Sequence, residues 1–508
     1  MACHSLKRLC YSEVLILSNA KELLIEVRHG RLRTALVIDG RLVELNVEDE
    51  EHPSLIGNIY IGRVEKIVDT LNACFVDLGL QHKGFLALAE ILPIGAKAIS
   101  GDKVSKHLCE GDKVCVQVLR DAYEDKGPKL TTHLRLASRS IVLTPGVSSI
   151  KISHRISVSK KRSYLRGLPR ELTSKKEGFI VRTAAQSNSE KEIIAQVESL
   201  KREYQIIKDR FCKSTTPTFI YGPPNGLIRT LRDRTPGDVS RIVIDDIQAY
   251  LEAKVYLEKE APALMKRLIY HKGPQPLFFR EELADDIDQA LAASIVLPSG
   301  GSVKITETPA LVAIDVNVAG TSKVRYEQSV LETNLEACAE ITRQIRLRNL
   351  SGLLVVDFVS MKNNISKNKV LTTLKKLVRG DPEQIFVAGF TRFGLVEMTR
   401  KRSKPSLRAS LGQSCLVCEG SGVALTARTH GFNVLDCLRL EGLSYQNQGL
   451  ELRVSKTVAS CLTGQLKVAL DHLKAEQGVE IKISVDATLK DEFFDIIPFP
   501  LTKGGLNG

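Results

Sequence analysis

Two short, nearly continuous apolar runs, separated by an amphipathic stretch, stand out in the hydrophobic pattern of the chain. The runs cover residues 310–317 and 353–358, and such runs are typical of strands that are buried on both faces of a sheet. The stretch between them has helical spacing, and Ser329 with Glu332 predicts a capping box at its start. The residues on its inner face are Leu331, Leu335, Cys338, Ile341 and Ile345. Strand, helix and strand with short connections predict a right-handed parallel crossover.

This crossover brings two aspartates, Asp315 and Asp357, to the same carboxyl edge of the predicted sheet, where open α/β sheets bind ligands. Asn317 points to the same side as Asp315, because side chains alternate along a strand. Two carboxylates and an amide oxygen are ligands that Mg²⁺ takes, and such an ion activates water for attack on a phosphodiester. The alternative is that each aspartate only caps a helix or ends a strand. Their pairing across one crossover favours the metal site.

Short strands precede this region. Residues 11–46 alternate apolar and polar positions and predict a small antiparallel sheet. Residues 56–136 continue as glycine-punctuated strands that interleave aromatic with basic residues, which suits an OB-type barrel that stacks bases and contacts phosphates. Tyr60, Phe75 and Phe85, spread over three of these strands, are the candidate stacking residues, although aromatic residues of a barrel are as often part of its core. Lys126 lies in a basic turn at the predicted rim, either solvated or in contact with a phosphate.

A strand over residues 178–183 ends on Arg182 and Thr183, a guanidinium and a hydroxyl that together could clamp a phosphate. Arg182 taken alone also fits an ordinary arginine at a strand end. Residues 151–170 are dense in positive charge, which suits a polyanion, and Ser189 opens a long amphipathic helix.

The later segments change to an α/β pattern after a Pro/Gly-rich connection at residues 215–226, a candidate domain boundary. Residues 294–306 predict a hairpin, and residues 385–390 predict one more buried strand. The basic cluster 398–402 follows that strand, and we expect it near the same edge as the aspartates.

Cys415 and Cys418, followed by a glycine-rich turn, have the spacing of half a zinc knuckle. A structural zinc ion takes four ligands, and this motif supplies two. Either two chains share one ion or the pair is redox-active, but a thioredoxin-like start is absent. His430 is a candidate third ligand and would still leave a fourth missing. Shared zinc is the favoured interpretation, and it predicts a homodimer.

Composition narrows the class of protein. The chain has 508 residues, 43% hydrophobic and 26% charged, which predicts several globular domains. Its formal net charge of +13 favours a polyanionic partner. The 11 cysteines lie mostly alone in apolar runs, and no signal-type or membrane-length apolar run is recognised. We therefore expect a cytoplasmic protein without an integral membrane segment.

Four runs carry a resemblance: 58–90, 334–337, 346–350 and 394–402. On these residues the chain resembles the ribonuclease E/G family of bacteria, and among its members the shorter, ribonuclease-G-like ones. The resemblance implies a multidomain fold of α+β and α/β type, with an OB-type β-barrel inserted in a ribonuclease-H-like subdomain and a deoxyribonuclease-I-like catalytic subdomain behind it. The implied domains are a first ribonuclease-H-like segment (1–50), the barrel (51–137), a second ribonuclease-H-like segment with a 5′ sensor (138–216), a linker (217–240), the catalytic subdomain (241–405), a zinc-link (406–423) and a small C-terminal domain (424–508).

The resemblance also implies a function: a Mg²⁺-dependent endoribonuclease that cleaves single-stranded RNA, prefers 5′-monophosphorylated substrates, and acts in rRNA and tRNA processing and mRNA decay. It carries the magnesium ligands onto Asp315 and Asp357 with Asn317 as their partner. The other implied roles are RNA binding for Phe75, Phe85 and Lys126, 5′-phosphate binding for Arg182 and Thr183, and zinc binding for Cys415 and Cys418. The implied assembly is a homodimer that shares zinc and can pair further into a homotetramer.

Three positions depart from the family pattern: Ser360 replaces a usual aspartate, Gly320 is the sole glycine left after Asn317, and Glu332 replaces a common asparagine. These departures leave open a catalytically weak RNA-binding protein of the same fold. The presence of both aspartates favours the enzyme.

Overall fold

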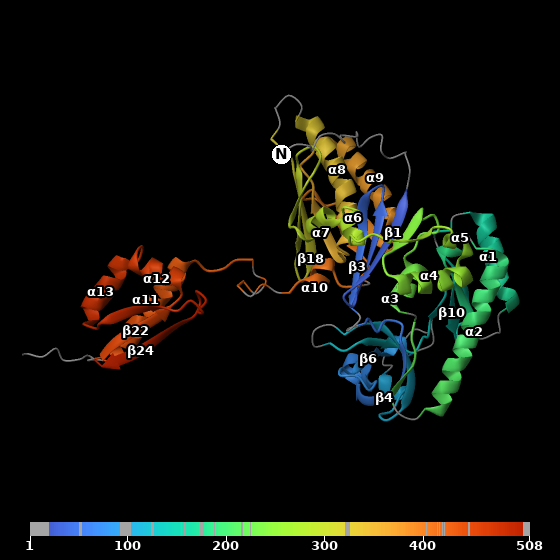
Figure 1. Cartoon of the computed structure of the whole chain (residues 1–508), viewed down its shortest axis with the longest axis horizontal. Coiled ribbons are helices and arrows are strands. Elements are labelled where there is room, and N and C mark those ends of the chain that lie inside the picture. The colour runs from blue at the N-terminus through green and yellow to red at the C-terminus, as the bar shows by residue number, and fades with distance from the viewer. Residues whose placement is uncertain are drawn as a thin grey trace, which may run out of the picture. The chain divides into compact units, whose positions relative to one another are not determined.

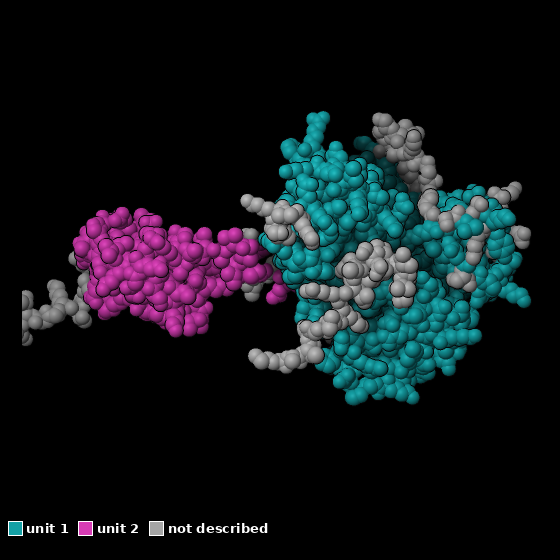
Figure 2. Space-filling view, turned by 90° about the horizontal axis from the view of Figure 1, so that it is seen from above, with its two compact units in different colours: residues 1–411 teal, residues 412–508 magenta. Residues whose placement is uncertain are grey.

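The computed structural model describes residues 20–49, 53–91, 103–122, 126–153, 155–156, 158–172, 177–186, 188–214, 217–223, 225–320, 326–402, 404–413, 415, 417–418, 420, 422–445 and 448–500. The chain divides into two compact units, residues 1–411 and residues 412–508 (Figure 2). Residues 11–19 of the predicted first sheet lie outside the described residues.

The first sheet of unit 1 has the strand order β15-β14-β1-β2-β3 (Figure 1). The antiparallel hairpins predicted near the N-terminus are confirmed from residue 20 onward, and β14 and β15 add in parallel beside β1. The strands are β1 (Lys21–Arg28), β2 (Arg31–Ile38), β3 (Arg41–Asp49), β14 (Arg241–Ile244) and β15 (Leu268–Tyr270). The helices that follow or separate them are α3 (Gly226–Asp233), α4 (Ile247–Glu260), α5 (Pro262–Met265), α6 (Leu277–Arg280) and α7 (Ala284–Leu291).

This sheet corrects one predicted boundary, the start of the catalytic subdomain at residue 241. Residues 241–270 belong to the first sheet because Leu23, Leu24 and Ile25 of β1 pair with β14, more than 200 residues away. Helix α4 buries Ala249, Ala253 and Leu257 in the core of this sheet, which completes a parallel crossover. The local sequence pattern indicates β1 and β14 as strands, but it does not show that they pair with each other.

The second sheet closes into a barrel of five strands, because β4 pairs with both β5 and β7. This confirms the OB-type barrel at the level of its architecture. Its strands are β4 (Ile59–Val68), β5 (Ala73–Asp77), β6 (Gly84–Ala87), β7 (Lys113–Arg120) and β8 (Lys129–Thr131). β13 (Thr218–Tyr221), from the predicted linker, adds to the outer side of β4.

A separate four-stranded sheet, β11-β12-β10-β9, follows the barrel in sequence. The elements are β9 (Leu136–Ala137), β10 (Ile141–Pro145), β11 (Ile150–Ile152), α1 (Ser159–Leu172), β12 (Glu177–Val181) and α2 (Glu190–Lys213). Ser189 starts α2 with a capping box, accepting from the backbone N–H of Glu192 at 3.4 Å. Ile193, Val197 and Leu200 on the inner face of α2 are buried, as their spacing predicts.

The largest open sheet, called the largest sheet below, has the order β16-β17-β18-β19-β21-β20. Its strands are β16 (Ser294–Val296), β17 (Ser302–Glu307), β18 (Leu311–Asn317), β19 (Gly352–Asp357), β20 (Ile385–Phe390) and β21 (Leu395–Arg400). The predicted crossover is confirmed, since β18 and β19 are parallel and α8 (Tyr326–Leu347) joins them. α8 and α9 (Asn364–Leu377) cover this sheet (Figure 1).

Two local predictions for this sheet are wrong. Its strands are buried on one face only: Ala313, Asp315 and Asn317 are exposed and alternate with buried Val312, Ile314 and Val316. The apolar run suggested otherwise because Ala313 reads as apolar although it faces outward. The predicted capping box is also wrong, because α8 begins at Tyr326 and Ser329 lies inside it. The predicted inner face of α8 holds, with Cys338, Ile341 and Ile345 fully buried.

The basic cluster 398–402 lies at the other end of the sheet from the aspartates. β21 runs antiparallel to β19, so that Arg400 pairs with Gly352 while Leu395 pairs with Asp357. Arg400 is also buried, and its guanidinium forms an ion pair with Asp381 at 3.1 Å. Arg400 therefore stabilises the sheet, and the cluster does not border the aspartates, contrary to the prediction.

Unit 1 ends with α10 (Leu407–Leu411), and unit 2 holds a three-stranded sheet, β23-β22-β24, with three helices. The elements are α11 (Ala427–Ser444), β22 (Gln448–Val454), α12 (Lys456–Thr463), α13 (Lys467–Gln477), β23 (Ile481–Val485) and β24 (Phe494–Pro500). This agrees with the small α+β domain predicted there. No helix in the described part of the chain has the length and apolarity needed to span a membrane.

Candidate active site

Asp315 and Asp357 are direct neighbours at the carboxyl edge of the largest sheet. They are register partners across the parallel pair β18–β19, which places their Cα atoms about 4.8 Å apart. Asn317, two residues on, donates its side-chain N–H to Asp315 Oδ2 at 2.8 Å. All three side chains are exposed on the face of the sheet that the helices leave open. The structure thus brings together the three residues that the sequence predicts as one site.

Lys304 extends this polar row on the other side. It is the register partner of Asp315 on β17 and is exposed on the same open face. The row across three neighbouring strands therefore reads Lys304, Asp315, Asp357. A cation at this position lies next to the first carboxylate and can approach an anionic substrate bound there.

Two buried contacts fix the loops around the carboxylates. Asn334 of α8, fully buried, donates to the carbonyl oxygen of Val359 at 2.9 Å and accepts from its N–H at 3.1 Å. This holds the loop that follows Asp357. Gly301 packs against the end of β18, where an added Cβ would lie 2.6 Å from the carbonyl oxygen of Asn317. Only glycine permits that approach.

The donor set fits a Mg²⁺ ion that keeps part of its water shell. Two carboxylates one strand spacing apart and an amide bonded to one of them leave the other coordination positions to water or substrate. Within the described ranges, no group of three or more His, Cys, Asp or Glu side chains could hold a metal ion. Ser360 is exposed in the loop after β19 and adds no carboxylate.

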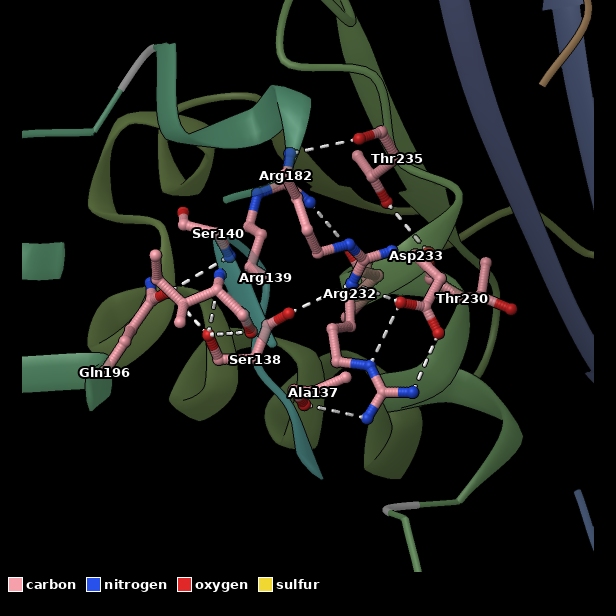
Figure 3. A network of polar contacts seen from close by, with 12 residues as sticks. Ala137, Ser138, Arg139, Ser140, Arg182, Gln196, Thr230, Arg232, Asp233 and Thr235 are labelled. Carbon is pink, nitrogen blue, oxygen red and sulfur yellow. Dashed lines mark hydrogen bonds and ion pairs between the residues drawn. The ribbon is translucent and has the colours of Figure 1, made fainter. Parts of the chain in front are cut away.

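Arg182 and Thr183 lie elsewhere, directly after β12, and Arg182 belongs to a network of polar contacts (Figure 3). Arg182 donates to Asp233 Oδ1 at 2.6 Å and to the carbonyl oxygen of Ser138 at 3.0 Å. Arg232 binds the same carboxylate through two nitrogens, at 2.8 and 3.2 Å. Burial alone would raise the pKa of Asp233, but the hydrogen bond from Arg232 and the charges of both arginines outweigh it and hold that pKa below its ordinary value. Asp233 thus orients Arg182 as a fixed cation.

A cavity of about 2000 Å³ opens in front of this network, and both Arg182 and Thr183 line it. Thr183 is exposed, and its hydroxyl lies 3.0 Å from that of Ser153. Cationic side chains that also line the cavity, together with several acidic ones, include Arg155, Arg229, Arg234, Arg346, Arg379 and Lys404. The cavity can therefore admit a phosphate next to Arg182, which would share the guanidinium with Asp233.

The barrel carries a third cluster, formed by four residues on adjacent strands. Lys66, Phe75, Phe85 and Lys129 are successive register partners across β4, β5, β6 and β8. The two phenyl rings lie 6.0 Å apart in an edge-on arrangement, and both are partly exposed. Two aromatic faces between two cations form a surface suited to single-stranded nucleic acid. Lys126 is exposed on the segment before β8, which runs beside β6 through a hydrogen bond from Phe85 N–H to the carbonyl oxygen of Pro128 at 2.8 Å.

Cys415 and Cys418 belong to unit 2, where Cys415 is exposed and Cys418 is half-buried. Backbone N–H groups of Cys418 and Val417 donate to the sulfur of Cys415 and lower its pKa, together with the Cys418 thiol. Donation to the sulfur stabilises the thiolate, which is the form that binds zinc. The described residues offer no third ligand beside the pair, so the motif fits half of a four-ligand site.

Several residues of these sites were missed from the sequence. Lys304 becomes evident only from strand register, because it is one polar residue in an alternating strand. Lys129 belongs to the basic turn predicted at the barrel rim, and register adds its position beside Phe85. Asp233 and Asn334 reach their partners across 51 and 25 residues of sequence, respectively. Alternation could have indicated Lys304 as outward-facing, but no local signal indicates the two longer contacts.

Fold and site together define a multidomain α+β protein with two distinct parts. One is a five-stranded barrel with an aromatic and basic outer surface, and the other is an α/β sheet that ends in paired carboxylates.

Comparison with known proteins then identifies the family. The model of the Ribonuclease E/G family matches residues 135–403. Ribonuclease G of Escherichia coli (strain K12) is 31% identical over 485 residues, covering 94% of this chain and 99% of the relative. Ribonuclease G of Haemophilus influenzae is 32% identical over 489 residues, with the same coverage. Ribonuclease E of Haemophilus influenzae is 31% identical over 471 residues, but the match spans 50% of that protein. The chain belongs to the ribonuclease E/G family.

Proposed function

We propose that this protein is a Mg²⁺-dependent endoribonuclease that cleaves single-stranded RNA and prefers 5′-monophosphorylated substrates. The observation that carries the proposal is the register of Asp315 with Asp357, with Asn317 hydrogen-bonded to the first. The names of the similar ribonucleases G and E support RNA as the substrate. The net charge of +13 agrees with a polyanionic partner.

In the proposed mechanism, Asp315 and Asp357 would hold the metal ion at the sheet edge, and Asn317 orients Asp315. A bound Mg²⁺ would supply activation of water and neutralisation of charge on the phosphodiester. Lys304, opposite Asp315, adds a positive charge next to the anionic phosphate. The open face of the sheet leaves this edge accessible to a long chain substrate.

The other clusters have separate roles in this proposal. Phe75 and Phe85 stack bases while Lys66, Lys126 and Lys129 contact phosphates, which holds an unpaired RNA segment on the barrel. Arg182, held by Asp233, and Thr183 bind the 5′-monophosphate in the cavity. A 5′-hydroxyl end would lack that contact and would react more slowly.

We also propose the assembly and subdomain layout that the family resemblance implies. Cys415 and Cys418 from two chains would close one zinc site and link a homodimer, which can pair further into a homotetramer. The first sheet would belong to the ribonuclease-H-like subdomain and the largest sheet to the deoxyribonuclease-I-like subdomain. Nine described cysteines are free, which supports action in the reducing cytoplasm. The roles proposed there, rRNA and tRNA processing and mRNA decay, are those that the family resemblance implies.

The direct test uses the purified full chain and a 5′-monophosphorylated single-stranded oligoribonucleotide with and without Mg²⁺. Internal cleavage that requires Mg²⁺, with a slower reaction on the 5′-hydroxyl form, is the expected result. Binding without cleavage at any Mg²⁺ concentration would favour the non-catalytic RNA-binding alternative.

A further inference from the structure

The turn at residues 391–394, which joins β20 to β21, presents an aromatic side chain to solvent. Phe393 is 92% exposed, the largest fraction of any large apolar side chain in the described part of the chain. Arg392 beside it is also exposed, and it forms no ion pair within the described ranges. Single exposed apolar residues are common on protein surfaces, so exposure alone assigns no role to Phe393. The rigidity of this turn and its position do indicate a role.

Hydrogen bonds fix the turn in one conformation. The Thr391 hydroxyl accepts from the backbone N–H groups of Phe393 and Leu395, both at 3.2 Å. The backbone of Thr391 also donates to the carbonyl oxygen of Leu395 at 2.7 Å and accepts from Gly394 at 3.1 Å. Gly394 has φ +88°, a backbone conformation that residues other than glycine rarely adopt. The backbone that carries Phe393 is therefore already ordered, so binding a ligand through this residue costs little further backbone entropy.

The turn also lies beside the candidate active site. Leu395, two residues after Phe393, is the register partner of Asp357. On the covered side of the sheet, Phe390 packs against Phe358, the residue after Asp357, with ring centroids 6.4 Å apart. Strand spacing and residue rise together place the backbone of Phe393 within roughly 10 Å of Asp357.

We propose that Phe393 and Arg392 form a stacking site for one unpaired nucleobase of the RNA, next to the phosphate that is cleaved. Phe393 supplies the ring face and Arg392 a cation for the neighbouring phosphate, the pairing that single-stranded nucleic-acid sites use. A base held in a duplex has no free face to offer, so this site adds selectivity for single strands at the point of reaction. The inference rests on the proposed function, because it takes Asp315 and Asp357 as the reacting centre.

The test compares the full-length parent with Phe393→Ala and Phe393→Tyr on a 5′-monophosphorylated oligoribonucleotide that has one mapped cleavage site. The control is Phe386→Ala, because Phe386 is 65% exposed on the same hairpin but lies at its far end, level with Thr399. We expect Phe393→Ala to lower kcat/KM by about five- to one-hundred-fold, Phe393→Tyr to restore it, and Phe386→Ala to change it less than about twofold.

Abasic substitutions along the oligoribonucleotide locate the base. One abasic position beside the cleavage site should reduce kcat/KM of the parent by about the same factor as Phe393→Ala does. The same abasic position should not lower kcat/KM of the Phe393→Ala protein further, because the substitution and the abasic position remove the same contact. Losses that multiply at every position would overturn the proposal, and so would a Phe393→Ala protein that matches the parent.

A binding measurement separates this inference from the proposed function. The Asp315→Asn protein, with and without Phe393→Ala, is titrated with oligoribonucleotides that carry 2-aminopurine at single positions. Quenching at one position that disappears with Phe393→Ala supports stacking, even if the parent does not cleave RNA. Quenching that Phe393→Ala leaves unchanged contradicts it. A Phe393→Ala protein whose sedimentation changes while its quenching does not would show that the ring contacts a protein surface instead.

Discussion

Asp315 is the in-register neighbour of Asp357 across a parallel strand pair, and both carboxylates open onto the uncovered face of the sheet. Neighbouring positions on parallel strands have one fixed spacing, so the protein holds the two charges together without a contact between their side chains. Like charges at this distance repel, and a divalent cation relieves that repulsion. We therefore expect a bound divalent cation to stabilise this arrangement.

Lys304 should oppose the metal ion at this edge. It faces Asp315 directly, so Lys304→Met removes a positive charge next to the first carboxylate. We expect the Mg²⁺ concentration for half-maximal cleavage to fall by up to about fivefold, the range for exposed charge pairs of about 0.2–1 kcal/mol. The control is Lys401→Met beyond the far end of β21, which should leave that concentration unchanged. An unchanged Mg²⁺ requirement in Lys304→Met would show that Lys304 does not affect the metal site, and a higher one would show that it favours metal binding instead of opposing it.

Arg182 should discriminate between RNA 5′ ends. Arg182→Ala removes the cation that Asp233 orients, and we expect cleavage of 5′-monophosphorylated RNA to slow at least about tenfold, as for a lost hydrogen bond to a charged group. Cleavage of 5′-hydroxyl RNA should change little. Arg234→Ala is the matched control, because Arg234 lines the same cavity outside this network. Equal losses on both substrates would mean that Arg182 serves folding or general RNA binding.

The row of Lys66, Phe75, Phe85 and Lys129 on the barrel should bind RNA in two ways, the phenyl rings by stacking on bases and the lysines by contacting phosphates. Phe75→Ala should weaken binding of single-stranded RNA by about five- to one-hundred-fold without changing its salt dependence. Lys129→Ala should instead reduce the slope of log affinity against log salt by about 0.7, because one phosphate contact is lost. Phe219→Ala, exposed on β13 outside the row, is the control. If Phe75→Ala binds RNA as the parent does, the two rings only complete the barrel.

Zinc should link two chains. The protein should contain about one zinc ion per two chains, and chelation should convert dimers to monomers, measured by metal analysis and sedimentation. Cys415→Ser should remove the zinc and the dimer, whereas Cys437→Ser, half-buried in α11, should keep both. One zinc ion per chain, or a dimeric Cys415→Ser protein, would point to a site within a single chain.

The sequence predicts the central site well because its residues belong to one local crossover. Apolar runs and helical spacing indicate β18, α8 and β19, and parallel topology then places Asp315 beside Asp357. What it does not predict depends on distant pairing. β14 joins β1 across more than 200 residues, and the antiparallel direction of β21 moves Arg400 to the other end of the sheet from Asp357. The open face was not predicted because Ala313 is apolar but exposed, so the alternation of buried and exposed positions in β18 does not appear in the hydrophobic pattern.

The most direct test of the account measures Mg²⁺-dependent cleavage of a single-stranded oligoribonucleotide by Asp315→Asn and Asp357→Asn. Glu397→Gln is the control, since Glu397 is an exposed carboxylate on the same open face, opposite Val355. The account predicts cleavage below about a tenth of the parent rate in both aspartate variants, a loss above ~1.4 kcal/mol in the barrier. RNA affinity and thermal stability should stay near those of the parent, and Glu397→Gln should cleave normally. A folded aspartate variant that cleaves at the parent rate would contradict the assignment of these carboxylates to the reaction.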